Sequence, residues 1–252
     1  MLFDTHAHLN DEAFETDRDE LICGLGEKDI GFVMNAGCSL VASRESIALA
    51  EKYPFIYASV GSHPDSADEV NEELIETYLQ MTKHPKVKAI GEIGLDYYYE
   101  GFDRQIQIKA FEVQMELAKQ AELPVIVHER DAHEDGMAMV RKFPEVTGVF
   151  HCYSGSAEMA RQLVDLGWYI GFTGVLTFKN ARKAVETAAS IPLERIVLET
   201  DCPYMSPEPY RGRRNDPGRL IHMAEKLAEI RGFPVEEIIE ITTENAKRRY
   251  RI

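Results

Sequence analysis

The sequence Leu2-Phe-Asp-Thr-His-Ala-His8 joins a short predicted β-strand to two histidines that are one residue apart. In a strand, side chains at positions i and i+2 lie on the same face, so His6 and His8 are expected to converge at the strand's end. Two neutral imidazoles held in this way form half of a metal site. Because a His-x-His pair also occurs by chance, the prediction depends on ligands from the rest of the chain.

Downstream of this stretch, short apolar segments alternate with segments of helical spacing. The further predicted strands are residues 31–37, 55–60, 87–91, 124–127, 148–150, 168–171 and 195–198. The predicted helices are residues 12–28, 40–53, 67–83, 103–121, 135–142, 157–166, 181–189, 218–230 and 235–249. Strands that are apolar on both faces are typical of a parallel sheet covered by helices.

Eight strand–helix repeats in 252 residues predict a (β/α)8 TIM-type barrel that forms a single domain over residues 1–252. A doubly wound open sheet is the second interpretation. The chain has neither a G-x-G-x-x-G after a strand nor a G-x-x-x-x-G-K-[ST] motif, so a nucleotide cofactor loses its main support.

Composition limits the classes of partner. The formal net charge of −15 argues against a broad electrostatic grip on nucleic acid, although metals and a local basic patch can still neutralise phosphates at one face. The apolar runs are too short to span a membrane, and the N-terminus does not resemble a signal peptide, so we expect a cytoplasmic protein. The four cysteines form no C-x-x-C pair and are expected to be reduced thiols.

Metal-ligating residue types recur where the predicted strands end. After the pair at the first strand, the set comprises His63, Glu92, His128, His151 and Asp201. Active sites of such barrels are built at the carboxyl ends of the strands, where these residues are expected to meet. Without His63 the set holds four histidines and two carboxylates, which is too many for one tetrahedral ion and suits two ions that share a carboxylate.

Several of these residues have an alternative structural interpretation. A single histidine at a strand end is often only a satisfied polar side chain, and Glu92 or Asp201 can cap a helix or form a salt bridge. His84, His133 and His222 lie on or beside predicted helices and are interpreted as surface or structural residues. Glu199 shares a strand face with Asp201, where it either supports a ligand or is simply buried.

The complete set of motifs resembles the TatD family of metal-dependent hydrolases, within the amidohydrolase-like barrels. The similarity spans nearly the whole chain. It rests on Asp4-Thr-His-Ala-His-Leu9, Val60-Gly-Ser-His-Pro64, Gly91-Glu-Ile-Gly-Leu-Asp-Tyr97, Val127-His-Glu-Arg-Asp-Ala132, Phe150-His-Cys-Tyr-Ser-Gly155, Leu198-Glu-Thr-Asp-Cys-Pro-Tyr204 and Pro209-Tyr-Arg-Gly-Arg-Arg-Asn-Asp-Pro217.

The resemblance implies two divalent metal ions per chain, with Zn, Mn or Mg as candidates. One ion would be held by His6, His8, Glu92 and Asp201, and the other by Glu92, His128 and His151. A water or hydroxide between the ions would be the nucleophile, and Asp201 would orient it and accept its proton.

The resemblance also implies deoxyribonuclease activity, with DNA or another phosphodiester as a transient partner and no obligate protein partner. Asp201, Glu92 and His63 are the expected catalytic residues. His63, Arg130, Arg211 and Arg213 are the expected contacts to substrate, because a guanidinium pairs bidentately with phosphate. Each of the three arginines can also be a solvated loop charge, and this alternative is favoured for Arg213. The aromatic run Tyr97–Tyr99 with Phe102 can stack bases or simply pack its loop.

Two positions depart from the family pattern. Asn10 stands where the family often has Asp, and Asp65 stands where it often has His, which places an acidic group beside His63. Two further functions therefore stay open from the sequence. One is hydrolysis of a small amide, lactone or ester with the same metals, and the other is a non-catalytic metal-binding protein that interacts with partners.

Overall fold

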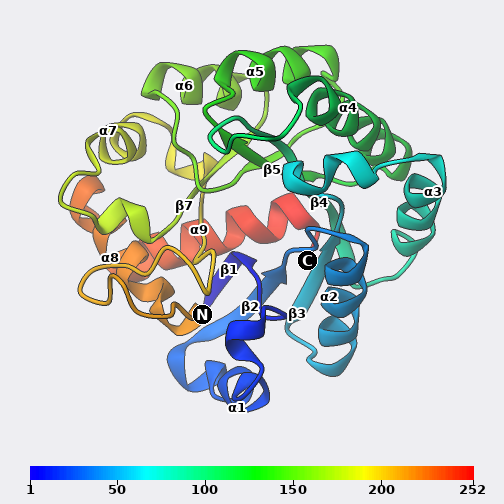
Figure 1. The fold of residues 1–252 in the computed structure, drawn as a ribbon. Helices are drawn as coiled ribbons and strands as arrows, with labels where there is room; N and C mark the ends of the chain where they lie inside the picture. Colours follow the sequence, from blue (N-terminus) through cyan, green and yellow to red (C-terminus); the bar gives the residue numbers. More distant parts are fainter.

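The computed structural model describes all 252 residues as one barrel of eight parallel strands surrounded by helices (Figure 1). The strands are β1 (Leu2–Ala7), β2 (Ile30–Asn35), β3 (Ile56–Val60), β4 (Val87–Asp96), β5 (Val125–Arg130), β6 (Gly148–Phe150), β7 (Tyr169–Phe172) and β8 (Ile196–Leu198). The α-helices are α1 (Arg18–Cys23), α2 (Leu40–Lys52), α3 (Glu72–Met81), α4 (Arg104–Ala121), α5 (His133–Lys142), α6 (Ala157–Asp165), α7 (Arg182–Ser190), α8 (Leu220–Arg231) and α9 (Val235–Tyr250).

The strands lie in sequence order, each parallel to the next. The sheet closes between β1 and β8, where Ala7 forms a bridge with Cys202 and the backbone N–H of Asp201 donates to the carbonyl of His6 at 2.9 Å. The predicted (β/α)8 barrel in a single domain is therefore confirmed, and the open doubly wound sheet was the wrong alternative.

Some predicted elements have different bounds in the structure. The segment predicted as one helix from Ala67 to Lys83 is a 3-10 helix, η3 (Pro64–Glu69), followed by α3. Asn71 separates the two because its side chain caps α3 by accepting from the N–H of Leu74. Residues 12–28 likewise divide into two 3-10 helices, η1 (Glu12–Phe14) and η2 (Leu25–Lys28), on either side of α1.

The end of the barrel where the strands begin is filled with apolar side chains. The barrel plug, as we call it, comprises Phe3, Met34, Ala89, Ile126, Val149, Tyr169, Val197, Ala246 and Tyr250. The last two residues belong to α9, which runs across the barrel in Figure 1. A larger cluster of 52 buried residues packs between the strands and the surrounding helices. Because α9 covers this end, the opposite end is the accessible one.

No helix of the structure combines the length and the apolar character that crossing a membrane requires. All four cysteines are free thiols. The cytoplasmic location expected from the sequence stays a prediction.

Candidate metal centre

The first group of ligand-type atoms lies at the end of β1. The Nε2 atoms of His6 and His8 are 3.1 Å apart, and Oε2 of Glu92 lies 3.3 Å from the first and 3.7 Å from the second. Oδ1 of Asp201 lies 3.7 Å from Nε2 of His6 and 3.4 Å from Nε2 of His8. The convergence predicted for the His-x-His pair is thus present, although the register of β1 against β2 shifts between Asp4 and Ala7.

A second group faces the other oxygen of Glu92. Its Oε1 atom is 2.9 Å from Nδ1 of His128 and 2.8 Å from Nε2 of His151, and these two nitrogens are 3.2 Å apart. The sequence therefore located six side chains that the fold brings into one cluster. Glu92 stands at its centre with one oxygen toward each group.

Glu92 holds this position because β4 is irregular around it. The strand continues to Asp96, five residues past the predicted end at Gly91, and its register against β5 shifts between Ile90 and Ile93. In this irregular stretch the N–H of Glu92 donates to the carbonyl of Gly37 at 2.6 Å instead of to β5. Irregular pairing of this kind re-aims a side chain, here toward the barrel axis.

His6 and Glu92 have the protonation states that metal ligation requires. Burial, with the nearby His151, lowers the pKa of His6 to about 4, so this imidazole is neutral at neutral pH. Burial opposes the charge of Glu92, but the imidazoles of His151 and His6 outweigh it and hold the pKa of this carboxyl well below its usual range. Partial burial opposes the charge of His128, but its contacts with Asp96 and Glu92 raise its pKa to about 10. The proton on this imidazole balances part of the carboxylate charge, which a bound cation would balance instead.

The spacing of the first group fits a divalent ion. Ligand atoms around a four-coordinate ion with bonds of about 2.0–2.2 Å lie roughly 3.3–3.6 Å apart. The five separations among His6, His8, Glu92 and Asp201 given above span 3.1–3.7 Å. Two imidazole nitrogens with two carboxylate oxygens also form a donor set that zinc and manganese accept. The residues present therefore fit a metal ion.

His63 lies at the edge of the second group. Its Nε2 atom is 3.8 Å from Oε1 of Glu92, and its ring meets that of His128 edge-on with centroids 4.4 Å apart. Its Nδ1 atom is 3.0 Å from Oδ1 of Asp65. The departure at position 65 thus gives His63 an acidic partner that fixes its ring with Nε2 toward the cluster. The other departure, Asn10, contacts Glu45 and Asn35.

Asp96 is a member of the site that was not predicted from the sequence. Its Oδ2 atom is 3.0 Å from Nε2 of His128, on the ring edge opposite Glu92. Because side chains alternate along a strand, a predicted strand extended to Asp96 would have placed Glu92, Gly94 and Asp96 on one face. This alternation is the sequence signal by which Asp96 could have been found. Gly94 is required there, since it has a φ of 142° and an added Cβ would lie 2.0 Å from the carbonyl oxygen of His128.

Glu199 lies behind the ligands, on the side away from Glu92. The rings of His6 and His151 are stacked at 3.9 Å, and the Nδ1 atoms of both are buried without a hydrogen-bond partner. Oε1 of Glu199 is 3.8 Å from Nδ1 of His151, and Thr5 donates to Oε2 at 3.3 Å. A Cβ at Gly171 would lie 2.6 Å from this carboxylate, so the glycine makes room for it. Burial raises the pKa of Glu199 to about 7.

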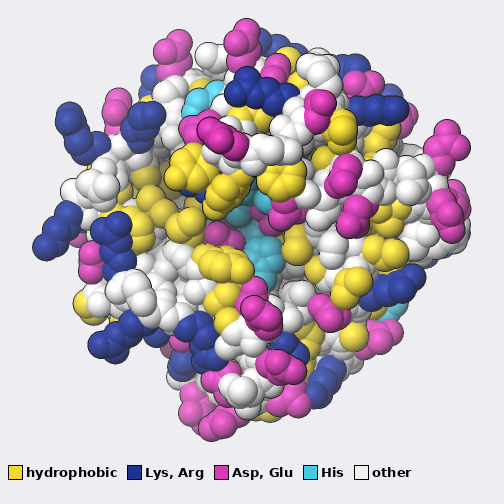
Figure 2. All heavy atoms as spheres, viewed as in Figure 1, with side chains coloured by type: hydrophobic (Ala, Val, Ile, Leu, Met, Phe, Trp, Pro, Cys, Tyr) yellow, Lys and Arg dark blue, Asp and Glu magenta, His cyan; other side chains and the backbone are white.

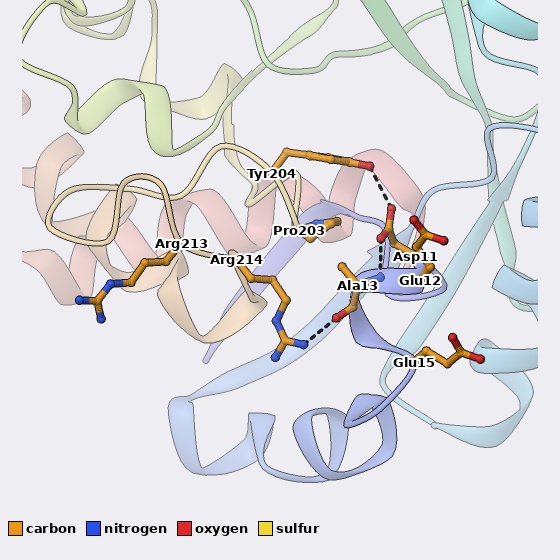
Figure 3. A pocket seen from close by; sticks show the side chains of 8 residues that line it. All are labelled: Asp11, Glu12, Ala13, Glu15, Pro203, Tyr204, Arg213 and Arg214. Atoms are coloured by element: carbon orange, nitrogen blue, oxygen red, sulfur yellow. Dashed lines mark hydrogen bonds between the residues drawn. The ribbon is translucent and has the colours of Figure 1, made fainter.

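The predicted arginines are placed differently from one another. The guanidinium of Arg130 lies 3.6 Å from the ring centre of Tyr98, at the end of β5. Arg211 lies 4.3 Å from the ring centre of Phe178. Arg213 lines a cavity of 610 Å³ together with Asp11, Tyr204 and Arg214, and its side chain points away from Tyr204 (Figure 3). Of the three, Arg130 is nearest in the chain to a predicted ligand, two residues after His128.

The remaining histidines make local contacts outside the cluster. His84 lies 3.2 Å from Glu51, His133 meets Glu129 four residues earlier, and His222 lies 3.0 Å from Glu225. These contacts agree with their predicted structural roles.

Comparison with known proteins places these features in a family. A family model described as TatD related DNase matches residues 3–251. The metal-dependent hydrolase YabD of Bacillus subtilis is 42% identical, over 100% of both chains. The 3'-5' ssDNA/RNA exonuclease TatD of Salmonella typhimurium is 29% identical, over 100% of this chain and 99% of that protein. The crystal structure of YJJV, a TatD homologue from Escherichia coli K12, superposes with a TM-score of 0.94 at 29% identity, over 100% of this chain and 98% of that one.

Proposed function

The chain belongs to the TatD-related DNase family of metal-dependent hydrolases, as its sequence motifs indicated, and from this premise we propose that it cleaves phosphodiester bonds in DNA with two divalent ions. The observation that carries the proposal is that the two carboxylate oxygens of Glu92 face different groups. Oε2 faces His6 and His8, and Oε1 faces His128 and His151. A carboxylate shared in this way is the expected bridge between two ions.

We assign the ligands on the same geometry. His6, His8 and Asp201 with Oε2 of Glu92 would hold one ion, and His128 and His151 with Oε1 of Glu92 would hold the other. When bound, such ions lower the pKa of a coordinated water and neutralise charge on the phosphoryl oxygens. Imidazole ligands favour zinc or manganese, and magnesium is the third candidate.

Asp201 is the group that would take the proton of the attacking water. Burial opposes its charge, but the hydrogen bond from His8 and the neighbouring His151 hold the pKa of this carboxyl below its usual value. Asp201 is therefore ionised at neutral pH, as a proton acceptor must be.

His63 would contact the phosphoryl or the leaving oxygen, because its Nε2 edge faces the cluster while Asp65 holds the opposite edge. Arg130, beside the second group, is the arginine best placed for a phosphate. Arg211 and Arg213 lie on the loop after β8, where we expect them to contact a longer strand.

The Salmonella typhimurium relative named a 3'-5' ssDNA/RNA exonuclease supports a single-stranded nucleic acid as the substrate. The test is an assay of the purified protein with Mg²⁺, Mn²⁺ or Zn²⁺ on end-labelled single-stranded DNA and on a panel of lactones and esters. We expect stepwise shortening of DNA that is lost in Asp201→Asn. Intact DNA under every metal with turnover of a carbonyl substrate would overturn the proposal, as would bound metal without turnover of any substrate.

A further inference from the structure

Large hydrophobic side chains gather at the mouth of the barrel, the end that the metal centre occupies. Two loops supply them, one after β4 and one after β8. The exposed members are Tyr98, Tyr99, Phe102, Tyr204 and Met205. Figure 2 shows hydrophobic side chains on both sides of a hollow in which histidine and acidic side chains are visible. Exposed aromatic rings beside a reactive centre are candidates for contacts with substrate.

The first loop fixes Tyr98 to the second ligand group. Its backbone N–H donates to Oδ1 of Asp96 at 2.9 Å, and the other oxygen of Asp96 lies 3.0 Å from His128. Arg130 lies 3.6 Å from the centre of the Tyr98 ring, and the Tyr99 ring meets Tyr98 edge-on at 5.1 Å. The ring is thus oriented by its neighbours, yet 55% of Tyr98 remains exposed.

The second loop places Tyr204 beside the first ligand group. Its ring meets the ring of His8 edge-on with centroids 6.4 Å apart, and its hydroxyl donates to Oδ2 of Asp11 at 3.0 Å. Figure 3 shows the side chain extended from its loop toward Asp11. Its backbone N–H donates to the carbonyl of Asp201 at 2.9 Å, and 55% of Tyr204 is exposed.

The two rings stand on opposite sides of the metal centre. The eight strands follow one another in order around the barrel, so β4 and β8 are diametrically opposed. A chain that lays its phosphate over Glu92 would therefore pass Tyr98 on one side and Tyr204 on the other.

The surrounding charge favours stacking over electrostatic attraction as the means of binding. The protein carries a formal charge of −15, and Asp11 and Asp65 both lie at this mouth. Aromatic rings bind nucleobases without needing net positive charge, and only unpaired bases expose their faces to them. In a duplex, each base is already stacked within the helix.

We propose that Tyr98 and Tyr204 form a clamp that stacks two unpaired nucleobases, one on each side of the phosphodiester at the metal centre. This rests on the proposed function, since it assumes that a nucleic acid strand is the substrate. The clamp accounts for how an acidic protein holds a polyanion, and it restricts that polyanion to a single-stranded end.

The experiment compares two strands of equal length with the metal-loaded protein. One is oligothymidylate, and the other is an abasic strand with the same phosphodiester backbone and no bases. The dissociation constant Kd is measured by fluorescence anisotropy on phosphorothioate versions, which are cleaved slowly, and kcat and KM are measured on normal strands. The variants are Tyr98→Ala and Tyr204→Ala, with Tyr98→Phe and Tyr204→Phe as ring-retaining partners. Phe233→Ala removes an exposed aromatic ring after α8, at the opposite end of the barrel.

We expect wild type to bind oligothymidylate more tightly than the abasic strand by at least about fivefold, the lower limit for stacking of one base. Each alanine variant should raise Kd for oligothymidylate by at least about fivefold and leave Kd for the abasic strand unchanged. Phe233→Ala should match wild type. The phenylalanine variants keep the rings and should lose less affinity for oligothymidylate than the alanine variants, although Tyr204→Phe also loses the hydrogen bond to Asp11. Because stacking is not ionic, the ratio of the Kd values for the two strands should depend only weakly on salt.

Equal affinity of wild type for the two strands would overturn the clamp, and so would alanine variants that lose both strands equally. If wild type cleaves both strands without preference, the clamp alone fails and the proposed function stands. If it cleaves neither strand under any metal, the proposed function fails and the clamp fails with it. Circular dichroism of each variant separates a lost contact from a lost fold.

Discussion

The two ends of the barrel are built from the same strands and carry opposite chemistry. Each strand that supplies a ligand to the mouth has first supplied an apolar side chain to the barrel plug. The pairs are Phe3 and His6, Ala89 and Glu92, Ile126 and His128, Val149 and His151, and Val197 and Asp201. Packing at the plug is mostly apolar, whereas the mouth buries carboxylates among imidazoles, which is costly without a partner cation.

The comparison indicates a division of labour along each strand. The barrel plug contributes to stability and holds the strands in register. At the mouth, the resulting rigidity keeps several carboxylates and several imidazoles close together. If the division is real, substitutions at the two ends should separate activity from stability, and the following predictions test that separation.

The largest effect is expected at Glu92. Replacing it with Gln keeps the shape and removes the charge that two groups of imidazoles share. We expect activity to fall by about a thousandfold or more, since in the proposed mechanism several kcal/mol of transition-state stabilisation would depend on both ions. If the centre holds two ions as proposed, bound metal, measured by elemental mass spectrometry after dialysis, should fall from two ions per chain to one or none. The metal-free unfolding free energy should change less than in the plug variant below.

Glu129→Gln is the matched control for Glu92. Glu129 is also buried and follows His128 directly, but it accepts from the N–H of Ala132 at the start of α5. This variant should lose some stability and keep both ions. If it lost metal as Glu92→Gln does, the effect would be general to buried carboxylates near the mouth and the assignment of a bridge would fall.

The plug should show the reverse behaviour. Tyr250 is 1% exposed and its ring lies 6.0 Å from that of Phe3. Tyr250→Ala leaves a cavity the size of an aromatic ring and should lower the unfolding free energy by about 3–5 kcal/mol. Metal content and kcat, measured well below the melting temperature, should remain near wild type. A variant that stays folded but loses activity in proportion would break the division of labour.

Tyr250→Phe refines this test. The hydroxyl of Tyr250 is buried without a hydrogen-bond partner. Removing an unsatisfied polar group is neutral or stabilising, so this variant should unfold no earlier than wild type in urea. A clear destabilisation would show that the hydroxyl has a partner, such as an ordered water.

A smaller effect is expected from Glu199, which lies between the two ends. Its carboxylate sits within 4.8 Å of ligand-type atoms of His6 and His151, where it can orient both imidazoles. Glu199→Gln should weaken metal binding by about 10- to 100-fold, the usual result of losing such a partner. Competition with a chromophoric chelator measures the affinity directly. Thr5→Val, which removes only one donor to Glu199, should have a smaller effect, and unchanged affinity in Glu199→Gln would reject this role.

The sequence predicted the mouth better than the path of the chain that builds it. Strand ends were recognisable because a buried apolar run followed by His, Asp or Glu is informative in itself, so all six expected ligands fell within one cluster. The irregular register of β1 and β4 was not recognisable, because local sequence does not encode which partner a backbone N–H will choose. That irregularity directs Glu92 toward the barrel axis. Asp96 was missed because it lies beyond the predicted end of the strand.

Contacts between separate loops were also beyond the sequence. Arg130 was expected to contact phosphate, but nothing local indicates that its guanidinium lies on Tyr98, because that pairing depends on the register between β4 and β5. The position of α9 across the end of the barrel could not be predicted either, because it also depends on tertiary structure. A helical pattern gives a length and an apolar face, and only the closed barrel determines where the last helix fits.

The smallest effect is expected at Asp65, a mouth residue that is exposed. Its carboxylate fixes His63, yet it also places negative charge where a phosphodiester would approach. Asp65→Asn should lower KM for DNA by about twofold to fivefold at low salt, because an exposed charge contributes at most about 1 kcal/mol. The gain should shrink as salt screens the repulsion. A modest fall in kcat should accompany it, since the amide holds the His63 ring less firmly than the carboxylate does.

Asp68→Asn separates the two roles of Asp65. Asp68 is an exposed residue of the same 3-10 helix, so the variant removes one negative charge from the same element. If charge alone matters, both variants should lower KM and leave kcat unchanged. If Asp65 also positions His63, only Asp65→Asn should lower kcat, and that fall should persist at high salt where the change in KM has vanished. A kcat that is equal in the two variants would remove His63 from the proposed chemistry, since its orientation would then have no kinetic consequence.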